Sequence, residues 1–185
     1  MNITKEYELE QEDCVKRNLK GYQKNIKDPV TLQRLRTLAK FIEGAPIVLS
    51  VGSGAHEPIY LNIYYAVDIP LCTYQLLKEQ GWRGSFYQCS CDAMPFGYKF
   101  FDCAVCSEVI EHLPDLETVR RTFLEVNRVA KKWIFTTPTR DVKEPTHKFI
   151  FTYEQLADLS RDLNAIIEQK GLFFYIHNND KKIFI

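Results

Sequence analysis

Residues 48–56 read Val48-Leu49-Ser50-Val51-Gly52-Ser53-Gly54-Ala55-His56, a short apolar run that ends in two closely spaced glycines. A second apolar run, at residues 64–67, ends in Asp68. Glycines at a strand end let the backbone turn tightly and approach a ligand, because no Cβ stands in the way. A carboxylate at the end of the next strand can hold both hydroxyls of a ribose. Together the two runs predict a pocket for a cofactor that contains a nucleoside.

The composition is that of a globular protein with one sizeable core. The chain has 185 residues, of which 45% are hydrophobic, and its 24 basic side chains balance 24 acidic ones. The overall charge therefore favours no class of partner. No apolar run approaches membrane-spanning length, and residues 1–6 lack the apolar core of a signal peptide. We expect a cytoplasmic protein with no membrane partner, and nothing in the sequence indicates the oligomeric state.

Six cysteines are compatible with free, mostly buried thiols, as is usual in the cytosol. The spacings Cys89-x-Cys91 and Cys103-x-x-Cys106 also occur in zinc sites. However, Cys103 and Cys106 lie within an apolar run that predicts a strand, and residues three apart on a strand point to opposite faces. We therefore favour free thiols over a structural zinc site.

Strand and helix patterns alternate after Gly44, which predicts an α/β fold with a doubly wound, mostly parallel, seven-stranded sheet and an antiparallel end. Before it, residues 1–44 predict one or two helices that cap the domain of residues 45–185. Their basic residues predict a solvated outer face or a rim that attracts an anionic substrate. The basic residues are Lys16, Arg17, Lys20, Lys24, Lys27, Arg34, Arg36 and Lys40. The expected strands are residues 47–51, 64–68, 84–90, 101–107, 133–137, 172–176 and 181–185, the last two forming a hairpin, and the expected helices after the cap are residues 70–80, 115–131 and 152–170.

The informative residues all lie at the carboxyl ends of expected strands or directly after them. In a doubly wound sheet, ligands bind outside the carboxyl ends of the strands, where the strand order reverses. One such residue or group at a strand end is weak evidence, but five together indicate a single site. They are Gly52 and Gly54, then Asp68, then residues 91–96, then Ser107 and Glu108, then Thr137 and Pro138.

These segments as a set resemble the class I S-adenosylmethionine-dependent methyltransferases, especially their small "methyltransferase type 11" branch. The resemblance covers roughly residues 45–185 and implies a Rossmann-like class I methyltransferase fold. The matching segments are residues 48–54, 66–69, 91–96, 101–113 and 135–138, with His147, Phe149, Thr152, Gln155 and Leu156 after them.

The resemblance also implies where S-adenosylmethionine would lie. The loop of Gly52, Ser53 and Gly54 would face its methionine part, and Asp68 would accept hydrogen bonds from its ribose. Ser107 and Glu108 would border the methyl-donor end. For the adenine, the resemblance implies that Asp92 bonds the amino group and that Ala93 offers a backbone amide, while Ile69 and Met94 press on the ring faces. A turn-forming role for Asp92 is the alternative.

Three features depart from the family pattern. Ser50 stands where the family usually has an acid that helps to hold the cofactor's ammonium group, and His56 stands where it usually has a third glycine. The segment between Gly52 and Asp68 is also short and contains Pro58, so we expect the first crossover helix to be only about one turn long. These departures favour an alternative in which the chain is a non-catalytic or degenerate S-adenosylmethionine-binding regulatory or scaffold protein.

A second group of residues, Glu108, Glu111 and His112 with the distant His147, could bind a divalent metal. The small-RNA 3′-terminal 2′-O-methyltransferases are similar here, because they use Glu-x-x-Glu-His and a distant His to hold a metal against a terminal ribose. In the type 11 branch, however, Glu-His-Leu is common without any metal. We therefore favour no metal, and keep a metal-assisted RNA methyltransferase as an alternative.

The sequence thus predicts an S-adenosylmethionine-dependent methyltransferase with no assigned catalytic residue. We favour a small-molecule methyl acceptor over RNA. An NAD-dependent oxidoreductase is less well supported, since Gly-x-Gly-x-x-Gly would need a glycine where Glu57 stands.

Overall fold

The structure is a computed structural model that describes residues 5–25, 28–141 and 143–184, with the side chains of residues 18–25 outside that description. The side chains of Lys20 and Lys24 of the expected basic face, and the whole of Lys27, therefore lie outside the description. The helices are α1 (Lys5–Asn25), α2 (Pro29–Ile42), α3 (Glu57–Tyr60), α4 (Leu71–Glu79), α5 (Leu116–Val129) and α6 (Tyr153–Leu159), with 3-10 turns η1 (Ile110–His112) and η2 (Arg161–Leu163). The strands are β1 (Val48–Val51), β2 (Tyr65–Asp68), β3 (Ser85–Gln88), β4 (Phe101–Ser107), β5 (Ala130–Pro138), β6 (Ile166–Lys170) and β7 (Phe173–His177).

The seven strands form one sheet in the order β3-β2-β1-β4-β5-β7-β6. The first five strands along the chain are parallel, and β7 runs antiparallel to both β5 and β6. The order reverses between β1 and β4, so the carboxyl ends of these two strands flank the switch point. The predicted doubly wound sheet with an antiparallel end is confirmed.

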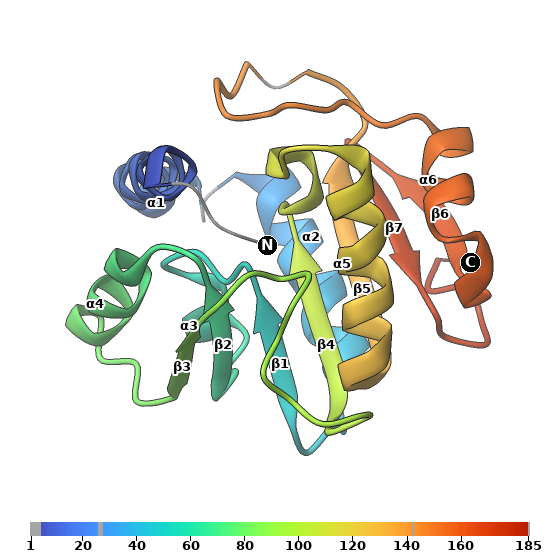
Figure 1. The fold of residues 1–185 in the computed structure, drawn as a ribbon, viewed down its shortest axis with the longest axis horizontal. Helices are drawn as coiled ribbons and strands as arrows, with labels where there is room; N and C mark the ends of the chain where they lie inside the picture. Colours follow the sequence, from blue (N-terminus) through green and yellow to red (C-terminus); the bar gives the residue numbers. More distant parts are fainter. Residues whose placement is uncertain (1–4, 26–27, 142, 185) are drawn as a thin grey trace.

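Helices cover both faces of the sheet, with α5 in front and α2 behind it in the view of Figure 1. The two faces bury separate apolar clusters. Cys106 packs with Phe123 of α5, whereas Cys103 packs with Leu38 of α2. The two cysteines therefore point to opposite faces, as their spacing in a strand predicts.

Polar residues at the helix starts fix where the helices begin. The carboxylate of Asp28 accepts a hydrogen bond from the Thr31 amide at the start of α2, and the carboxylate of Asp115 accepts one from the Thr118 amide at the start of α5. Thr152 caps α6 with the reciprocal pair of bonds that a glutamine three residues later allows. These caps satisfy amides that have no partner inside the helix.

The C-terminal prediction was wrong in two respects. The helix expected over residues 152–170 ends at Leu159, and residues 166–170 form β6. Gly171, with φ +62°, turns the chain from β6 into β7 instead of ending a helix. Residues 181–184 form no strand. The amides of Ile183 and Phe184 donate to the buried carboxylate of Glu168 instead of to a neighbouring strand. Ile185 lies outside the described residues.

The first crossover is one turn of helix, α3, as the short segment before Asp68 predicts. Throughout the described ranges, no helix has the length and apolarity that a membrane crossing requires.

Candidate functional site

A cleft of about 450 Å³ lies at the carboxyl ends of β1, β2 and β4, with α1 and α2 contributing one wall. This volume is typical of small-molecule pockets. Seven of the expected cofactor-binding residues line it, and they come from three strand ends: Gly52, Ser53, Gly54, Asp68, Ile69, Ser107 and Glu108. Other lining residues were not predicted as binding residues from the sequence, among them Tyr7, Gln11, Cys14, Arg34, Glu57, Cys89, Cys91 and Phe173.

The glycine loop needs its glycines for different reasons. Gly52 and Gly54 both have positive φ angles, +62° and +53°. A Cβ on Gly52 would lie 2.6 Å from a methyl carbon of Val109, whereas a Cβ on Gly54 would meet nothing within 4 Å. Gly52 therefore allows the loop to pack closely against the segment after β4, and Gly54 supplies only backbone freedom.

Asp68 is held at the cleft by three hydrogen bonds. Its carboxylate accepts bonds from the amides of Gly54 (3.0 Å) and Ile69 (2.8 Å) and from the Thr73 hydroxyl (3.1 Å). Burial raises the pKa of Asp68 to about 6, although these bonds favour the charged form. The contact with Gly54 links the glycine bend directly to the β2 carboxylate.

A second polar group occupies the end of the cleft between β1 and β4. The Ser50 hydroxyl donates to Oε1 of Glu57 (2.8 Å), and Nη1 of Arg34 donates to the Ser107 hydroxyl (2.7 Å). Burial raises the pKa of Glu57 to about 7, against the effects of Ser50 and of the Arg34 guanidinium. Sequence signals for both were present, since Arg34 belongs to the expected basic rim and Glu57 to the shortened crossover.

Glu108 adopts a left-handed backbone conformation with φ +57°. Its amide donates to the carbonyl of Thr136 (3.0 Å), and the hydroxyl of Thr136 donates back to its carboxylate (3.0 Å). Nη1 of Arg34 lies 3.5 Å from the same carboxylate oxygen. These contacts hold Glu108 in a conformation that non-glycine residues rarely adopt.

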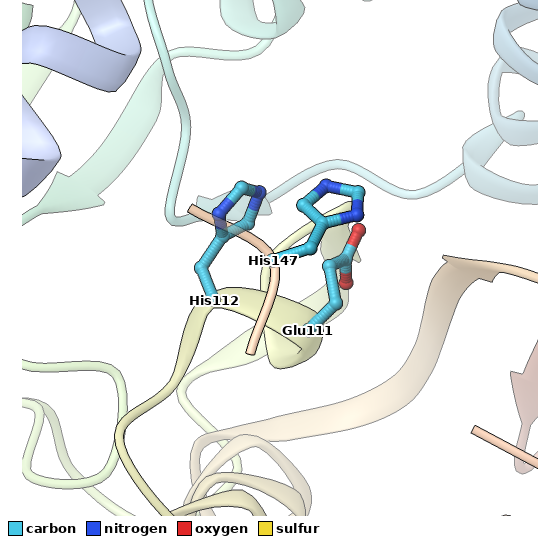
Figure 2. Close-up of side chains that lie close together, drawn as sticks. All are labelled: Glu111, His112 and His147. Atoms are coloured by element: carbon cyan, nitrogen blue, oxygen red, sulfur yellow. The ribbon is translucent and has the colours of Figure 1, made fainter. Parts of the chain in front are cut away.

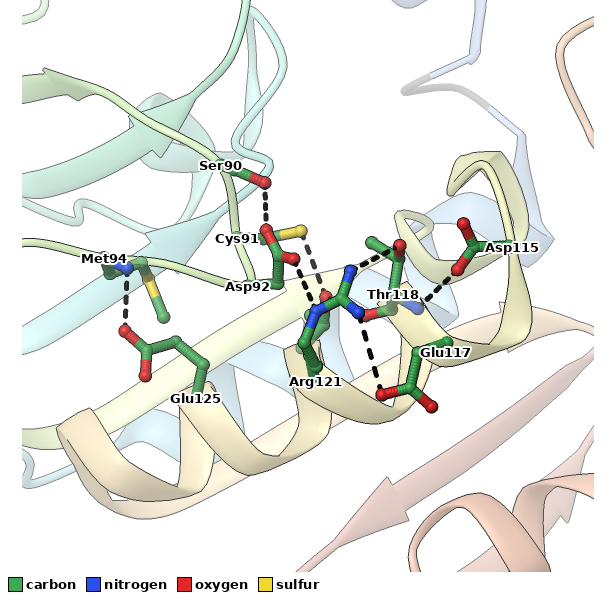
Figure 3. Close-up of polar contacts among 10 residues, drawn as sticks. Ser90, Cys91, Asp92, Met94, Asp115, Glu117, Thr118, Arg121 and Glu125 are labelled. Carbon is green, nitrogen blue, oxygen red and sulfur yellow. Dashed lines mark hydrogen bonds and ion pairs between the residues drawn. The ribbon is translucent and has the colours of Figure 1, made fainter. Parts of the chain in front are cut away.

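Asp92 is not among the residues that line the cleft, and its side chain points toward Arg121 of α5 (Figure 3). Its carboxylate, only 3% exposed, pairs with Nε of Arg121 at 3.0 Å and accepts a hydrogen bond from Ser90. The Ala93 amide donates to the Ser90 carbonyl (3.1 Å), and the Met94 amide donates to Glu125 (2.7 Å). The structure therefore does not bring Asp92, Ala93 and Met94 to the cleft, and their role in adenine binding stays a prediction.

Glu111, His112 and His147 come together (Figure 2), and the two histidines line the cleft. One ligand atom from each lies within 4.8 Å of the others. The segment that carries His147 is fixed in place because the amides of Lys148 and Phe149 donate to the carbonyl of Glu111 (2.8 and 3.3 Å). Glu108, the fourth residue of the expected set, faces Arg34 and Thr136 instead.

The two imidazoles have the protonation state that binds a cation, whereas burial favours the neutral form of the Glu111 carboxyl group. Burial lowers the pKa of His112 to about 4, with a smaller effect from His147, whose own pKa burial also lowers. Both imidazoles are therefore neutral near pH 7, which is the form that binds metals. Burial, and then the charge of Glu108, raise the pKa of Glu111 well above its ordinary value.

Three contacts tie α1 to this side of the cleft. The Tyr7 hydroxyl donates to the carbonyl of His112 (3.3 Å). Arg17 pairs with Glu144 (3.0 Å), and Lys148 pairs with Glu10 (3.1 Å). The N-terminal helix and the segment after β5 thus enclose the cleft together.

Comparisons with known proteins agree with this architecture. A family model described as a methyltransferase domain matches residues 49–133. A similar solved structure is an S-adenosylmethionine-dependent methyltransferase from Thermotoga maritima, described as a possible histamine N-methyltransferase, with a TM-score of 0.68 and 16% identity over 87% of this chain and 95% of that one. Another is an S-adenosylmethionine-dependent methyltransferase from Archaeoglobus fulgidus, with a TM-score of 0.67 and 16% identity over 84% of this chain and 97% of that one.

A third similar structure is the methyltransferase domain of the bacterial protein CtHen1, with a TM-score of 0.61 and 17% identity over 78% of this chain and 96% of that one. At these identities the likeness to solved structures establishes the fold. No curated protein matches the sequence significantly.

Proposed function

We propose that the chain is a class I S-adenosylmethionine-dependent methyltransferase and that the cleft at the ends of β1, β2 and β4 binds the cofactor. The observation that carries this proposal is the 3.0 Å bond from the Gly54 amide to Asp68, which places the glycine bend and a carboxylate on the same wall. In this placement the ribose hydroxyls reach Asp68 and the methionine part follows residues 52–54. Glu108 and Ser107 border the methyl-donor end.

The cofactor supplies an activated methyl group, so the protein has to position the acceptor and exclude water. The enclosed side of the cleft, between α1 and the segment after β5, is where we place the acceptor. We favour a small molecule, because α1 is tied across this side by the contacts of Tyr7 and Arg17. We also propose that the protein acts in the cytoplasm, since all six cysteines are free thiols.

Calorimetry with S-adenosylmethionine, S-adenosylhomocysteine and NAD tests the cofactor assignment. We expect both adenosyl compounds to bind and NAD not to bind. Asp68→Ala should weaken the binding of both adenosyl compounds, whereas Asp158→Asn, which removes an exposed carboxylate on α6, should change neither affinity. Absence of binding by the unmodified protein would contradict the proposal.

Metal-assisted methylation of an RNA 3′ end is the second candidate, favoured by the cluster of Glu111, His112 and His147. Within the described residues, Oε1 of Glu111 and Nδ1 of both histidines are buried and lack a hydrogen-bond partner. One carboxylate and two neutral imidazoles fit a divalent transition metal such as Mn²⁺. Such an ion would favour deprotonation of a coordinated ribose hydroxyl.

This second candidate has its own test. We expect Mn²⁺ alone to bind the unmodified protein, as measured by electron paramagnetic resonance, and His147→Ala to weaken that binding. An oligonucleotide ending in a 2′-hydroxyl should then accept a methyl group, whereas the same oligonucleotide with a terminal 2′-deoxyribose should not. If Mn²⁺ fails to bind, this candidate is excluded and the small-molecule acceptor remains.

A further inference from the structure

A carboxylate lies where the family resemblance leads one to look for an acid, although the chain has a serine there. Ser50 is fully buried in β1, and its hydroxyl donates to Oε1 of Glu57 at 2.8 Å. Glu57 is the first residue of α3 and lines the cleft. The one-turn crossover therefore brings a side chain from seven positions further along the chain to the carboxyl end of β1.

A guanidinium enters the same cleft and favours the charged form of the Glu57 carboxylate. Arg34 enters the cleft from α2, with Nη1 2.7 Å from the hydroxyl of Ser107 and its guanidinium carbon 5.1 Å from the centre of the Phe173 ring. Nε of Arg34 is buried and has no hydrogen-bond partner among the described residues. A buried donor without a partner costs free energy, which a ligand oxygen would recover.

We propose that Glu57 and Arg34 together hold the amino-acid end of S-adenosylmethionine, with Glu57 accepting hydrogen bonds from the α-ammonium and Arg34 donating to the α-carboxylate. This inference rests on the proposed function. The two ends of a zwitterion lie close together on one carbon, and so do the two opposite charges at this end of the cleft. Ser50 keeps the Glu57 carboxylate oriented instead of contributing an acid of its own.

The charge environment supports this role. Glu57 is faced by Arg34 from α2, by Ser50 from β1, and by Ser107 and Glu108 from the end of β4. Burial makes the ionised carboxylate unfavourable when the cleft holds no ligand, and an ammonium group would stabilise its charged form. A bound zwitterion would therefore add a cationic partner to the Glu57 carboxylate and a second anionic partner to the Arg34 guanidinium, which already lies 3.5 Å from Glu108.

Three thioether ligands distinguish the contribution of the amino-acid end to binding affinity from that of the rest of the cofactor. S-adenosylhomocysteine carries the full amino-acid end, its deaminated analogue lacks only the amino group, and 5′-methylthioadenosine lacks the whole end. Calorimetry with the unmodified protein should give S-adenosylhomocysteine an affinity about tenfold or more above that of the deaminated analogue, because a charge-assisted hydrogen bond is lost.

The matching variant is Glu57→Gln, which keeps the size of the side chain and its bond to Ser50. This variant should bind S-adenosylhomocysteine about tenfold or more weakly than the unmodified protein does. Its affinities for the deaminated analogue and for methylthioadenosine should stay within about twofold of those of the unmodified protein. Unchanged methylthioadenosine binding also shows that the variant has folded. Asp158→Asn is the control and should change none of the three affinities.

Two outcomes would overturn the inference and leave the proposed function intact. One is that the unmodified protein binds S-adenosylhomocysteine and its deaminated analogue equally well, a result that needs no variant. The other is that Glu57→Gln weakens all three ligands alike. If the unmodified protein binds none of the three, the proposed function fails, and this inference fails with it.

Discussion

Gly52→Ala should destabilise the protein far more than Gly54→Ala, although both glycines belong to the same loop. Both positions have positive φ angles, which cost an alanine about 1–2 kcal/mol. At Gly52 the new Cβ would also lie 2.6 and 2.9 Å from the two methyl carbons of Val109, where carbon atoms normally stay about 3.5–4.0 Å apart. Overpacking of this kind costs about 1–3 kcal/mol more.

The expected loss of stability is therefore about 1–2 kcal/mol for Gly54→Ala and about 2–5 kcal/mol for Gly52→Ala. In a domain of this size each kcal/mol lowers the melting temperature by about 2–4 °C. Urea unfolding at 25 °C, followed by circular dichroism, would measure the two free energies of unfolding.

Val109→Ala provides an internal check on the cause. It removes both methyl carbons and leaves the Val109 Cβ, which would lie 3.3 Å from the added Cβ. The double variant Gly52→Ala/Val109→Ala should therefore be more stable than the sum of the single changes predicts, by about 1–2 kcal/mol. Equal losses at Gly52 and Gly54, or additive effects with Val109→Ala, would refute this explanation of the loop.

Three other measurements examine the same cleft. Asp68→Ala should weaken S-adenosylmethionine binding by over tenfold, about 1.4 kcal/mol or more, and an unchanged affinity in calorimetry would contradict the placement of the ribose. Because the folded state raises the pKa of Glu57 from 4.5 to about 7, its contribution to stability is fully present below pH 4.5 and is lost as the pH rises towards 7. Glu57→Gln should remove this loss of stability. The loss is at most about 3 kcal/mol, because water in the open cleft screens the charge. If the unmodified protein and Glu57→Gln show parallel pH profiles in urea unfolding, Glu57 does not cause the pH dependence. Glu111→Gln should weaken Mn²⁺ binding as His147→Ala does, and electron paramagnetic resonance signals from both variants identical to that of the unmodified protein would exclude the cluster as a metal site.

The order of strands and helices could be predicted from the sequence because local patterns determine most of it. The apolar runs at residues 48–51 and 101–107 are buried on both faces, and a strand in that setting shows an almost continuous apolar pattern. The grouping of Gly52, Asp68 and Glu108 then follows from one rule, that the carboxyl ends of parallel strands share an edge.

The parts that could not be predicted depend on contacts between distant residues. Asp92 pairs with Arg121, which lies 29 positions later on α5, and nothing near Asp92 in the sequence indicates that partner. Similarly, β6 is a strand because it pairs with β7. Its local sequence pattern is also compatible with a continuation of the preceding helix, which is what we predicted. Glu57 was overlooked as a binding residue because its significance comes from Ser50 and Arg34, each on a different element.

The Ser50–Glu57 hydrogen bond has a consequence for how degenerate enzymes are recognised. A comparison made column by column would score position 50 as the loss of an acid and could class this chain as inactive. A comparison made in three dimensions finds the carboxyl group of Glu57, from another position in the sequence, 2.8 Å from the Ser50 hydroxyl. When a chain is classed as inactive because one conserved residue is replaced, its structure should therefore be checked for another side chain that occupies the same place.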